Sequence, residues 1–185
     1  MRPRPLPPML PEVIQAALQV CDGTEYYAGG VCHSCGGILT GYDTRTKRFA
    51  LLCDSEGDRP VEVILHRGYC RNCGHTVMPD EPFYPGTRVG APVVDLCRAL
   101  SRYSSCGKVA VLLGRMGVKV DRWSVAAYCN LPVAPPSTVL AFGMDIPVSI
   151  ITLSALAGEP DRKRPASGDD VLFACNYPSR AKDLL

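Results

Sequence analysis

Four cysteines in two identical pairs are the residues of this sequence best suited to chemistry. Cys32 and Cys35 form a C-x2-C-G turn in VCHSCGG, and Cys70 and Cys73 form another in YCRNCGH. The thiolates of two such turns can surround one metal ion, and the glycine after each pair tolerates a positive φ. Four thiolates leave no open coordination position, so the spacing predicts one structural Zn²⁺ ion rather than a catalytic one.

Other metals and other ligands compete with this interpretation. Paired C-x2-C-G turns also bind iron in rubredoxin-like domains, but here the flanking residues are basic and aromatic residues make up only 7% of the chain. His33, His66 and His75 lie near the turns, where a histidine is more often a surface group or a neighbour of the ligands than a ligand. Cys53 lies in an apolar stretch and is expected to pack as a small hydrophobic side chain.

The ten cysteines do not by themselves indicate a disulfide-bonded secreted domain. The opening stretch MRPRPLPPML lacks the apolar segment of a secretory signal, and no run reaches the ~20 apolar residues of a membrane-spanning helix. Thiols stay reduced in the cytosol, so we expect a cytoplasmic, non-membrane protein whose cysteine pairs bind metal. A disulfide-rich secreted domain remains the alternative.

Positive charge is concentrated in the middle of the chain, although the formal net charge is only +2. Residues 86–130 contain seven basic side chains and two acidic ones, Asp95 and Asp121, which gives the segment a charge of +5 and leaves −3 for the remainder. An excess of this kind within one segment is typical of a phosphate-binding surface.

The same segment has the periodicity of three short helices. Apolar residues recur at i, i+3, i+4 and i+7 within 93–100 and again within 109–116. Gly117 is suited to end the second helix, and Asp121 is suited to cap a third. Three short helices with a tight turn before the last predict a helix-turn-helix over 86–130, whose last helix would enter the major groove of duplex DNA.

Six side chains of this segment are the expected DNA contacts. Three of them open the third helix, where they would lie nearest the base edges, while Val125 and Tyr128 of that helix are expected to pack inward. Three basic residues precede it and are expected to bind phosphates, which would fix the register of the protein on the duplex. The expected contacts are Lys108, Arg115, Lys119, Arg122, Trp123 and Ser124.

Before this segment the sequence predicts a short helix and small antiparallel hairpins. Residues 1–30 form an N-terminal extension in which 11–20 has helical apolar spacing. Residues 48–53 and 61–66 alternate like strands and lie between turn-forming clusters, which predicts a zinc ribbon over 31–79.

The tail, residues 131–185, is expected to form a small β-containing unit. It has two apolar runs, 146–157 and 171–175, and Cys175 is expected in a buried strand of the second. Asp145 ends another apolar run, as an acid of a catalytic strand would, and is a weak catalytic candidate. No second acid pairs with it in the sequence, which leaves enzymatic activity undecided but unfavoured.

Three stretches resemble the N-terminal region of prokaryotic insertion-sequence transposases: HRGYCRNCGHTV, YPGTRVGAPVVDLCRALSRY and LLGRMGVKVDRWSVAAYC. In that group a zinc ribbon precedes a helix-turn-helix with a glycine–valine pair, a polar cap, an arginine, Ser/Thr positions and an aromatic residue. Trp123 departs from the small hydroxyl residue common there. The matching positions are Gly117, Val118, Asp121, Arg122, Ser124, Val125 and Tyr128.

The resemblance spans about residues 31–130. The sequence as a whole predicts an α+β fold, with a small zinc ribbon followed by a three-helix helix-turn-helix domain and a short β-containing tail. Such transposases continue into an RNase H-like domain in which three carboxylates hold two metal ions. The 55 residues after position 130 are too few for that domain, so the tail would be at most a remnant of it. The expected function is zinc-dependent binding of duplex DNA without a complete catalytic core. The alternatives are a free-standing transcription regulator, which could bind as a homodimer, and a zinc-stabilised adaptor for protein partners.

Overall fold

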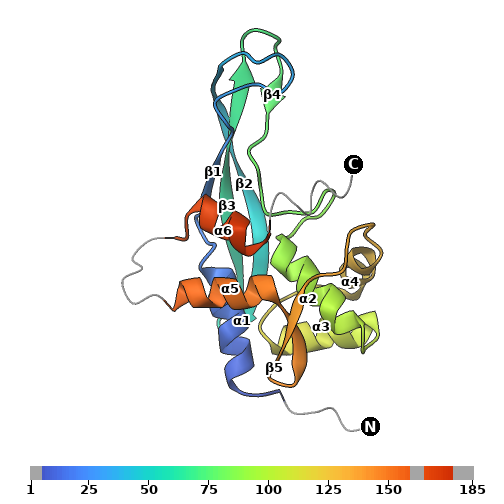
Figure 1. Cartoon of the computed structure of the whole chain (residues 1–185). Helices are drawn as coiled ribbons and strands as arrows, with labels where there is room; N and C mark the ends of the chain where they lie inside the picture. Colours follow the sequence, from blue (N-terminus) through green and yellow to red (C-terminus); the bar gives the residue numbers. More distant parts are fainter. Residues whose placement is uncertain (1–5, 159–164, 177–185) are drawn as a thin grey trace.

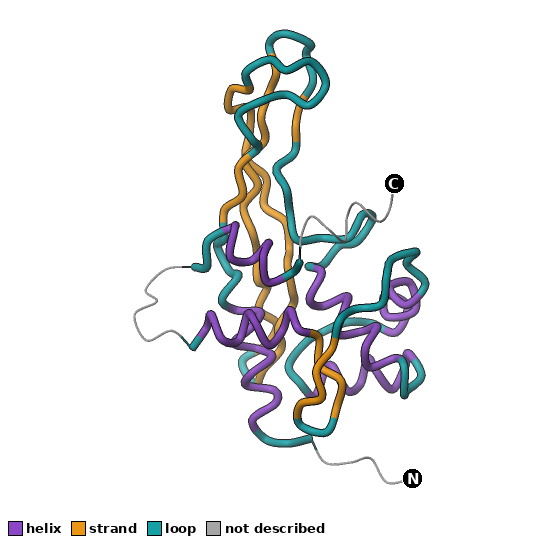
Figure 2. Tube along the Cα trace, in the orientation of Figure 1, coloured by secondary structure: helices purple, strands orange, loops and turns teal. Residues whose placement is uncertain are grey.

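The structure is a computed structural model that describes residues 6–158 and 165–176. These residues form a mixed α+β fold of six helices and two β-sheets (Figures 1 and 2). The helices are α1 (Met9–Gln19), α2 (Ala91–Ser101), α3 (Cys106–Arg115), α4 (Arg122–Cys129), α5 (Val148–Ala157) and α6 (Gly168–Ala174). The strands are β1 (Glu25–Tyr27), β2 (Leu39–Asp54), β3 (Gly57–Cys70), β4 (Thr76–Val77), β5 (Thr138–Ala141) and β6 (Met144–Pro147).

One long antiparallel hairpin dominates the fold. Strands β2 and β3 pair from Leu39 opposite Cys70 to Asp54 opposite Gly57. β1 pairs in parallel with β3, and β4 pairs with β3 near the cysteine turns. Figure 1 shows that the end of the hairpin with β4 projects away from the helices. We call this projecting part, residues 31–46 and 66–77, the arm.

The predicted strands over 48–53 and 61–66 are confirmed but are much shorter than the observed ones. Residues 41–47, which the sequence places in a turn cluster, continue β2 as a strand. Threonines and a tyrosine in this stretch favour extended backbone, and β3 offers a partner along the whole length.

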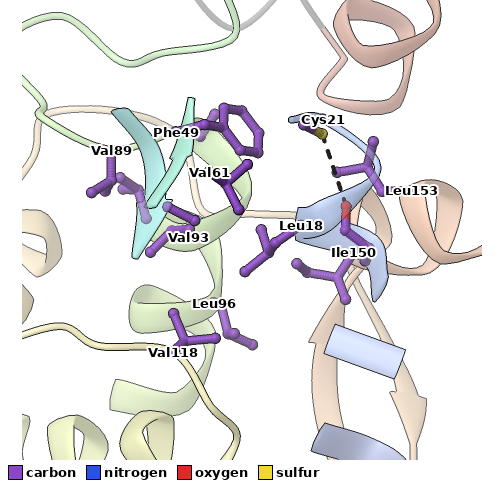
Figure 3. Close-up of a cluster of buried hydrophobic side chains, with 14 of the residues drawn as sticks. Leu18, Cys21, Phe49, Val61, Val89, Val93, Leu96, Val118, Ile150 and Leu153 are labelled. Atoms are coloured by element: carbon purple, nitrogen blue, oxygen red, sulfur yellow. Dashed lines mark hydrogen bonds between the residues drawn. The ribbon is translucent and has the colours of Figure 1, made fainter. Parts of the chain in front are cut away.

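The hydrophobic core is one cluster at the base of the hairpin, shared by all the segments distinguished in the sequence. It contains Ile14 of α1, Val61 of β3, Leu113 of α3 and Leu153 of α5, all fully buried. Figure 3 shows side chains from α1, the hairpin, α2 and α5 meeting in this cluster. No residue of the arm belongs to it.

The three helices predicted between residues 91 and 130 are present as α2, α3 and α4. The apolar residues at the i, i+3, i+4 and i+7 positions of the two predicted stretches, 93–100 and 109–116, are buried in the core, except that Leu112 is only half-buried. Val111, between these positions, is 66% exposed. Gly117 ends α3 with a φ of +77°. Asp121 caps α4 as predicted, since its carboxylate accepts the backbone N–H groups of Trp123 and Ser124, both at 2.9 Å.

The turn between α3 and α4 is bonded to the open edge of β2. The N–H of Cys53 donates to the carbonyl of Gly117 at 2.9 Å, and the N–H of Lys119 donates to that of Leu51 at 2.8 Å. A Cβ atom on Gly117 would lie 2.3 Å from the side chain of Gln15 in α1. Helix α4 is therefore held in a fixed position relative to the hairpin.

The described part of the tail contains a two-stranded sheet and the helices α5 and α6, so the strand predicted at 171–175 is wrong. That run belongs to α6, and Ser167 caps it by accepting the N–H of Asp170 at 3.1 Å. Cys175 follows α6 and is buried in the core, as expected, but not in a strand. Most of the run 146–157 is α5.

Within the described ranges, 6–158 and 165–176, no helix combines the length and the apolar character needed to cross a bilayer.

Candidate functional site

The four cysteines of the two turns meet at the tip of the arm. Cys32 Sγ lies 3.6 Å from Cys73 Sγ, Cys35 Sγ lies 3.4 Å from Cys70 Sγ, and all four sulfurs lie within 4.8 Å of one another. Sulfurs at the corners of a tetrahedron, each about 2.3 Å from a central ion, would be about 3.8 Å apart. The cluster could therefore bind one metal ion. Each of the two close sulfur pairs joins a cysteine of the first turn to a cysteine of the second.

The two turns have the same backbone geometry. In the first, the Cys32 N–H donates to the Gly37 carbonyl and the Gly36 N–H donates to the Cys32 carbonyl, both at 2.8 Å. Gly36 has a φ of +71°, as the sequence predicts for the glycine after the pair. The second turn repeats this arrangement. The Cys70 N–H donates to the His75 carbonyl at 2.9 Å, the Gly74 N–H donates to the Cys70 carbonyl at 2.8 Å, and Gly74 has a φ of +73°.

The electrostatics of the cluster favour a bound cation. The backbone N–H of Gly37, together with the neighbouring thiols, lowers the pKa of Cys35 to about 7. The N–H of His75 acts in the same direction on Cys73, but burial and the three neighbouring thiols together raise the pKa of Cys73 to about 12. Four thiolates so close together repel one another, and a divalent cation among them would offset that repulsion and displace the remaining protons.

The histidines near the turns are neighbours of the cluster or lie outside it. His75 Nδ1 lies 3.3 Å from Cys73 Sγ, whereas His66 contacts Glu25 at 3.0 Å and His33 is exposed. In the described part of the chain the possible metal ligands gather only as the four cysteines. Sequence reasoning missed Asn72, whose amide donates to Cys35 Sγ at 3.7 Å, although its place inside the second turn was the available signal.

A second group of candidate residues lies at the start of α4. Arg122 and Trp123 are both exposed, with 71% of Trp123 accessible. The guanidinium carbon of Arg122 lies 4.5 Å from the centre of the Trp123 ring, which makes a cation–π pair. Val125 and Tyr128 pack inward on the opposite side of the helix. The exposed end of α4 therefore presents one cation and one aromatic surface.

The other expected DNA contacts differ in whether their side chains are already paired within the protein. Lys108 and Arg115 are exposed on α3. Lys119 makes an ion pair with Asp58 in the hairpin, and the Ser124 hydroxyl donates to the Asp121 carboxylate at 2.7 Å. Lys119 and Ser124 are thus already engaged within the chain.

Replacing Asp121 with alanine is expected to lower the free energy of unfolding by about 1 kcal/mol, because three donors lose their acceptor. Hydrogen bonds from the Ser124 hydroxyl and from backbone N–H groups lower the pKa of Asp121. The stabilisation is therefore present at neutral pH and is lost as the pH falls through this lowered pKa. Urea unfolding of Asp121→Ala and Asp121→Asn at pH 7 and pH 3 would test this. Equal stability of wild type and Asp121→Ala at pH 7 would contradict it.

Asp145 lies in β6 of the small two-stranded sheet. The run that it was expected to end is not one strand, because it reverses between β5 and β6 at Phe142 and Gly143, which have φ values of +54° and +72°. The Tyr103 hydroxyl donates to Asp145 at 2.5 Å, and Arg102 lies 3.8 Å away. Asp145 therefore joins the end of α2 to the small sheet.

Comparisons with protein-family models, with curated proteins and with solved structures gave no match. Function is therefore inferred from the residues described above.

Proposed function

We propose that this protein binds duplex DNA, with the N-terminal end of α4 in the major groove and one structural Zn²⁺ ion at the tip of the arm. On this proposal α2 and α3 support α4 as the first helices of a helix-turn-helix. The protein would serve as the recognition part of a machinery like that of the insertion-sequence transposases that it resembles.

The observation that carries the DNA proposal is the exposed pair Arg122–Trp123 at the N-terminus of α4, which hydrogen bonds hold in place. Recognition helices read base edges with the residues of their first turn. Here that turn is capped by Asp121 and bonded through Lys119 to Leu51 of β2, so Arg122 and Trp123 are held out from the base of the hairpin. Arginine is also the side chain that most often reads guanine, through two hydrogen bonds.

Zinc is favoured at the arm because the ligand set is four sulfurs with no open position, which suits a structural Zn²⁺ ion. The arm contributes no residue to the hydrophobic core, so a bound metal would supply folding free energy that its own packing lacks. Iron is the competing metal. Ferric thiolate centres are coloured and zinc sites are not, so the absorption spectrum of the purified protein distinguishes the two metals.

Phosphate contacts are assigned first to Lys108 and Arg115, which are exposed on α3. Lys119 is a weaker candidate than the sequence suggests, because it is paired with Asp58 and lies beside the hairpin turn that also carries Asp54 and Glu56. DNA bound against α4 would have to displace that pairing or leave Lys119 out of contact.

The test is binding of the zinc-loaded protein to a randomised pool of duplexes over a series of salt concentrations. If several phosphates are neutralised, the logarithm of the affinity should fall with the logarithm of the salt concentration, with a slope of about −0.9 for each. Arg122→Ala is expected to weaken binding to the selected sequence by about 1–3 kcal/mol and to relax the preference for it.

Arg45→Ala, which removes an equally exposed arginine from the arm, is the matched control and should leave the sequence preference unchanged. An unchanged preference in Arg122→Ala would exclude Arg122 from base reading. Failure of the wild-type protein to bind any duplex at low salt would overturn the DNA proposal.

A free-standing transcription regulator is distinguished from a transposase-like protein by the form of its DNA site. A dimeric regulator would protect two symmetric half-sites about 34 Å apart, or a multiple of that distance, because the symmetry of the dimer is imposed on the DNA. A single asymmetric site would favour recognition of a transposon end.

One observation favours a protein-interaction adaptor as the second candidate function. Leu140 in β5 and Phe173 in α6 are 78% and 81% exposed, and Val148 at the start of α5 is partly exposed. Large apolar side chains at such exposure are typical of interaction surfaces when they lie together. Loss of all DNA binding in the experiment above would make the adaptor the leading candidate.

A further inference from the structure

A shallow open groove runs along the outer edge of the hairpin, beside the turn that leads into α4. It is lined by Thr46, Arg48 and Leu51 of β2, Glu62 of β3, and Arg88 of the loop before α2. None of the DNA contacts expected from the sequence lies in it. We call it the edge groove.

Backbone hydrogen bonds fix the place of the edge groove relative to α4. The Gly90 N–H donates to the carbonyl of Phe49, and the Lys119 N–H donates to the carbonyl of Leu51, both at 2.8 Å. These two carbonyls belong to residues two apart in one strand. The loop that carries Arg88 and the turn that carries Lys119 therefore lie side by side on the edge of β2.

Two cations of the edge groove are available to a ligand. Arg48 and Arg88 are exposed, and within the described residues neither side chain makes an ion pair or a hydrogen bond. Lys47, which also lines the groove, is held by Glu81 at 2.6 Å and lies over the ring of Phe83. Glu62 is the single acid in the lining of the edge groove.

We propose that the edge groove binds phosphates of the DNA strand that borders the major groove occupied by α4, through Arg48 and Arg88. This inference rests on the proposed function. The major groove is about 12 Å wide, so a helix inside it has a phosphate backbone on either side. A guanidinium group pairs with a phosphate through two parallel hydrogen bonds, which suits an arginine pair at this position.

The inference is tested with the variant Arg48→Ala/Arg88→Ala, a duplex of the selected sequence and an unrelated duplex of equal length. Loss of two phosphate contacts should reduce the steepness of the salt dependence by about 1.8 for both duplexes. The ratio of the two affinities should stay as in the wild type, because phosphate contacts carry no sequence information. This result would differ from that of Arg122→Ala, which should change the ratio.

Arg45→Ala/Arg102→Ala is the control, since it removes two exposed arginines outside the edge groove, although these lie 3.9 Å from Asp43 and 3.8 Å from Asp145. Its salt dependence should equal that of the wild type. A wild-type slope in Arg48→Ala/Arg88→Ala, or an equal loss in the control, would overturn the groove as a phosphate site while leaving the DNA-binding function standing. Absence of binding by the wild type would overturn both proposals.

Discussion

Cys70→Ser is expected to reduce the metal content from about one zinc ion per chain to nearly none and to unfold the arm. Serine replaces a thiolate by a hydroxyl, which stays protonated at neutral pH and is a poor ligand for zinc. Apparent binding free energies of structural zinc sites are about 10–16 kcal/mol, and most of this would be lost with one of four ligands. The same replacement at Cys32, Cys35 or Cys73 is expected to have an equal effect, because each removes one of the four ligands.

The effect should be confined to the arm, because the arm and the base are stabilised by different interactions. Apart from the cluster, the arm is held by the hairpin ladder, by the stacked rings of Tyr42 and Tyr69 at 5.7 Å, and by the pairing of Arg67 with Asp43. An isolated hairpin of this kind is marginal in water. The helices and the lower hairpin have their own core.

Two measurements would check this prediction: the metal content of the purified protein, and hydrogen exchange of the backbone amides resolved by residue. Backbone amides of residues 31–46 and 66–77 should lose protection in Cys70→Ser, while those of α1 and α2 should keep it. Cys53→Ser is the matched control, since Cys53 lies outside the cluster and its thiol donates to the Gly114 carbonyl, at 3.9 Å. Full zinc content in Cys70→Ser, or an equal loss in Cys53→Ser, would contradict the assignment of the site.

The parts of this fold that could be predicted from the sequence are those specified by local patterns. The two C-x2-C-G turns predict the cysteine cluster because the spacing alone brings each pair of sulfurs together. Asp121 and Gly117 mark the ends of helices through side-chain capping and a positive φ, both properties of single residues.

The helices of the tail could not be predicted from periodicity. Helix α5 reads VSIITLSALA and is apolar on nearly all sides, so it lacks the 3.6-residue alternation that distinguishes a helix from a buried strand. Helix α6 is short, and its one local signal, the cap Ser167 followed by Asp169 and Asp170, reads equally well as a polar loop.

Pairings between residues far apart in the chain could not be predicted from the sequence either. The parallel pairing of β1 with β3 joins residues about 40 positions apart. The bonds between Gly117, Lys119 and the edge of β2 join the predicted zinc ribbon to the predicted helices. The edge groove depends on the bond from the Gly90 N–H to the Phe49 carbonyl, which brings the loop of Arg88 to β2. The sequence therefore carries no signal that Arg48 and Arg88 share a site.

Phe49→Ala is expected to cost about 3–5 kcal/mol of stability, the range for removing a large aromatic ring from a core. Phe49 is fully buried at a register shift of β2, and its ring meets that of Phe83 edge to face, with centroids 5.9 Å apart. Small domains are stable by about 5–15 kcal/mol, so this loss would bring the protein close to unfolding. Tyr42→Ala, on the exposed part of the same strand, should cost less than about 1 kcal/mol.

The cause of that cost can be isolated with Gly90, the residue against which the Phe49 ring packs. A Cβ atom on Gly90 would lie 2.3 Å from the ring, although the φ of −60° and ψ of 150° at Gly90 suit alanine. Gly90→Ala alone should therefore destabilise the protein by about 1–3 kcal/mol through overpacking.

In the Phe49→Ala background the clash is gone, and Gly90→Ala should change the free energy of unfolding by less than about 0.5 kcal/mol. Alanine is a poorer helix cap than glycine, but it also lowers the entropy of the unfolded chain, and the two effects oppose each other. Urea unfolding of the four proteins gives the coupling. Equal costs of Gly90→Ala in both backgrounds would show that the Phe49 ring does not dock the hairpin on α2.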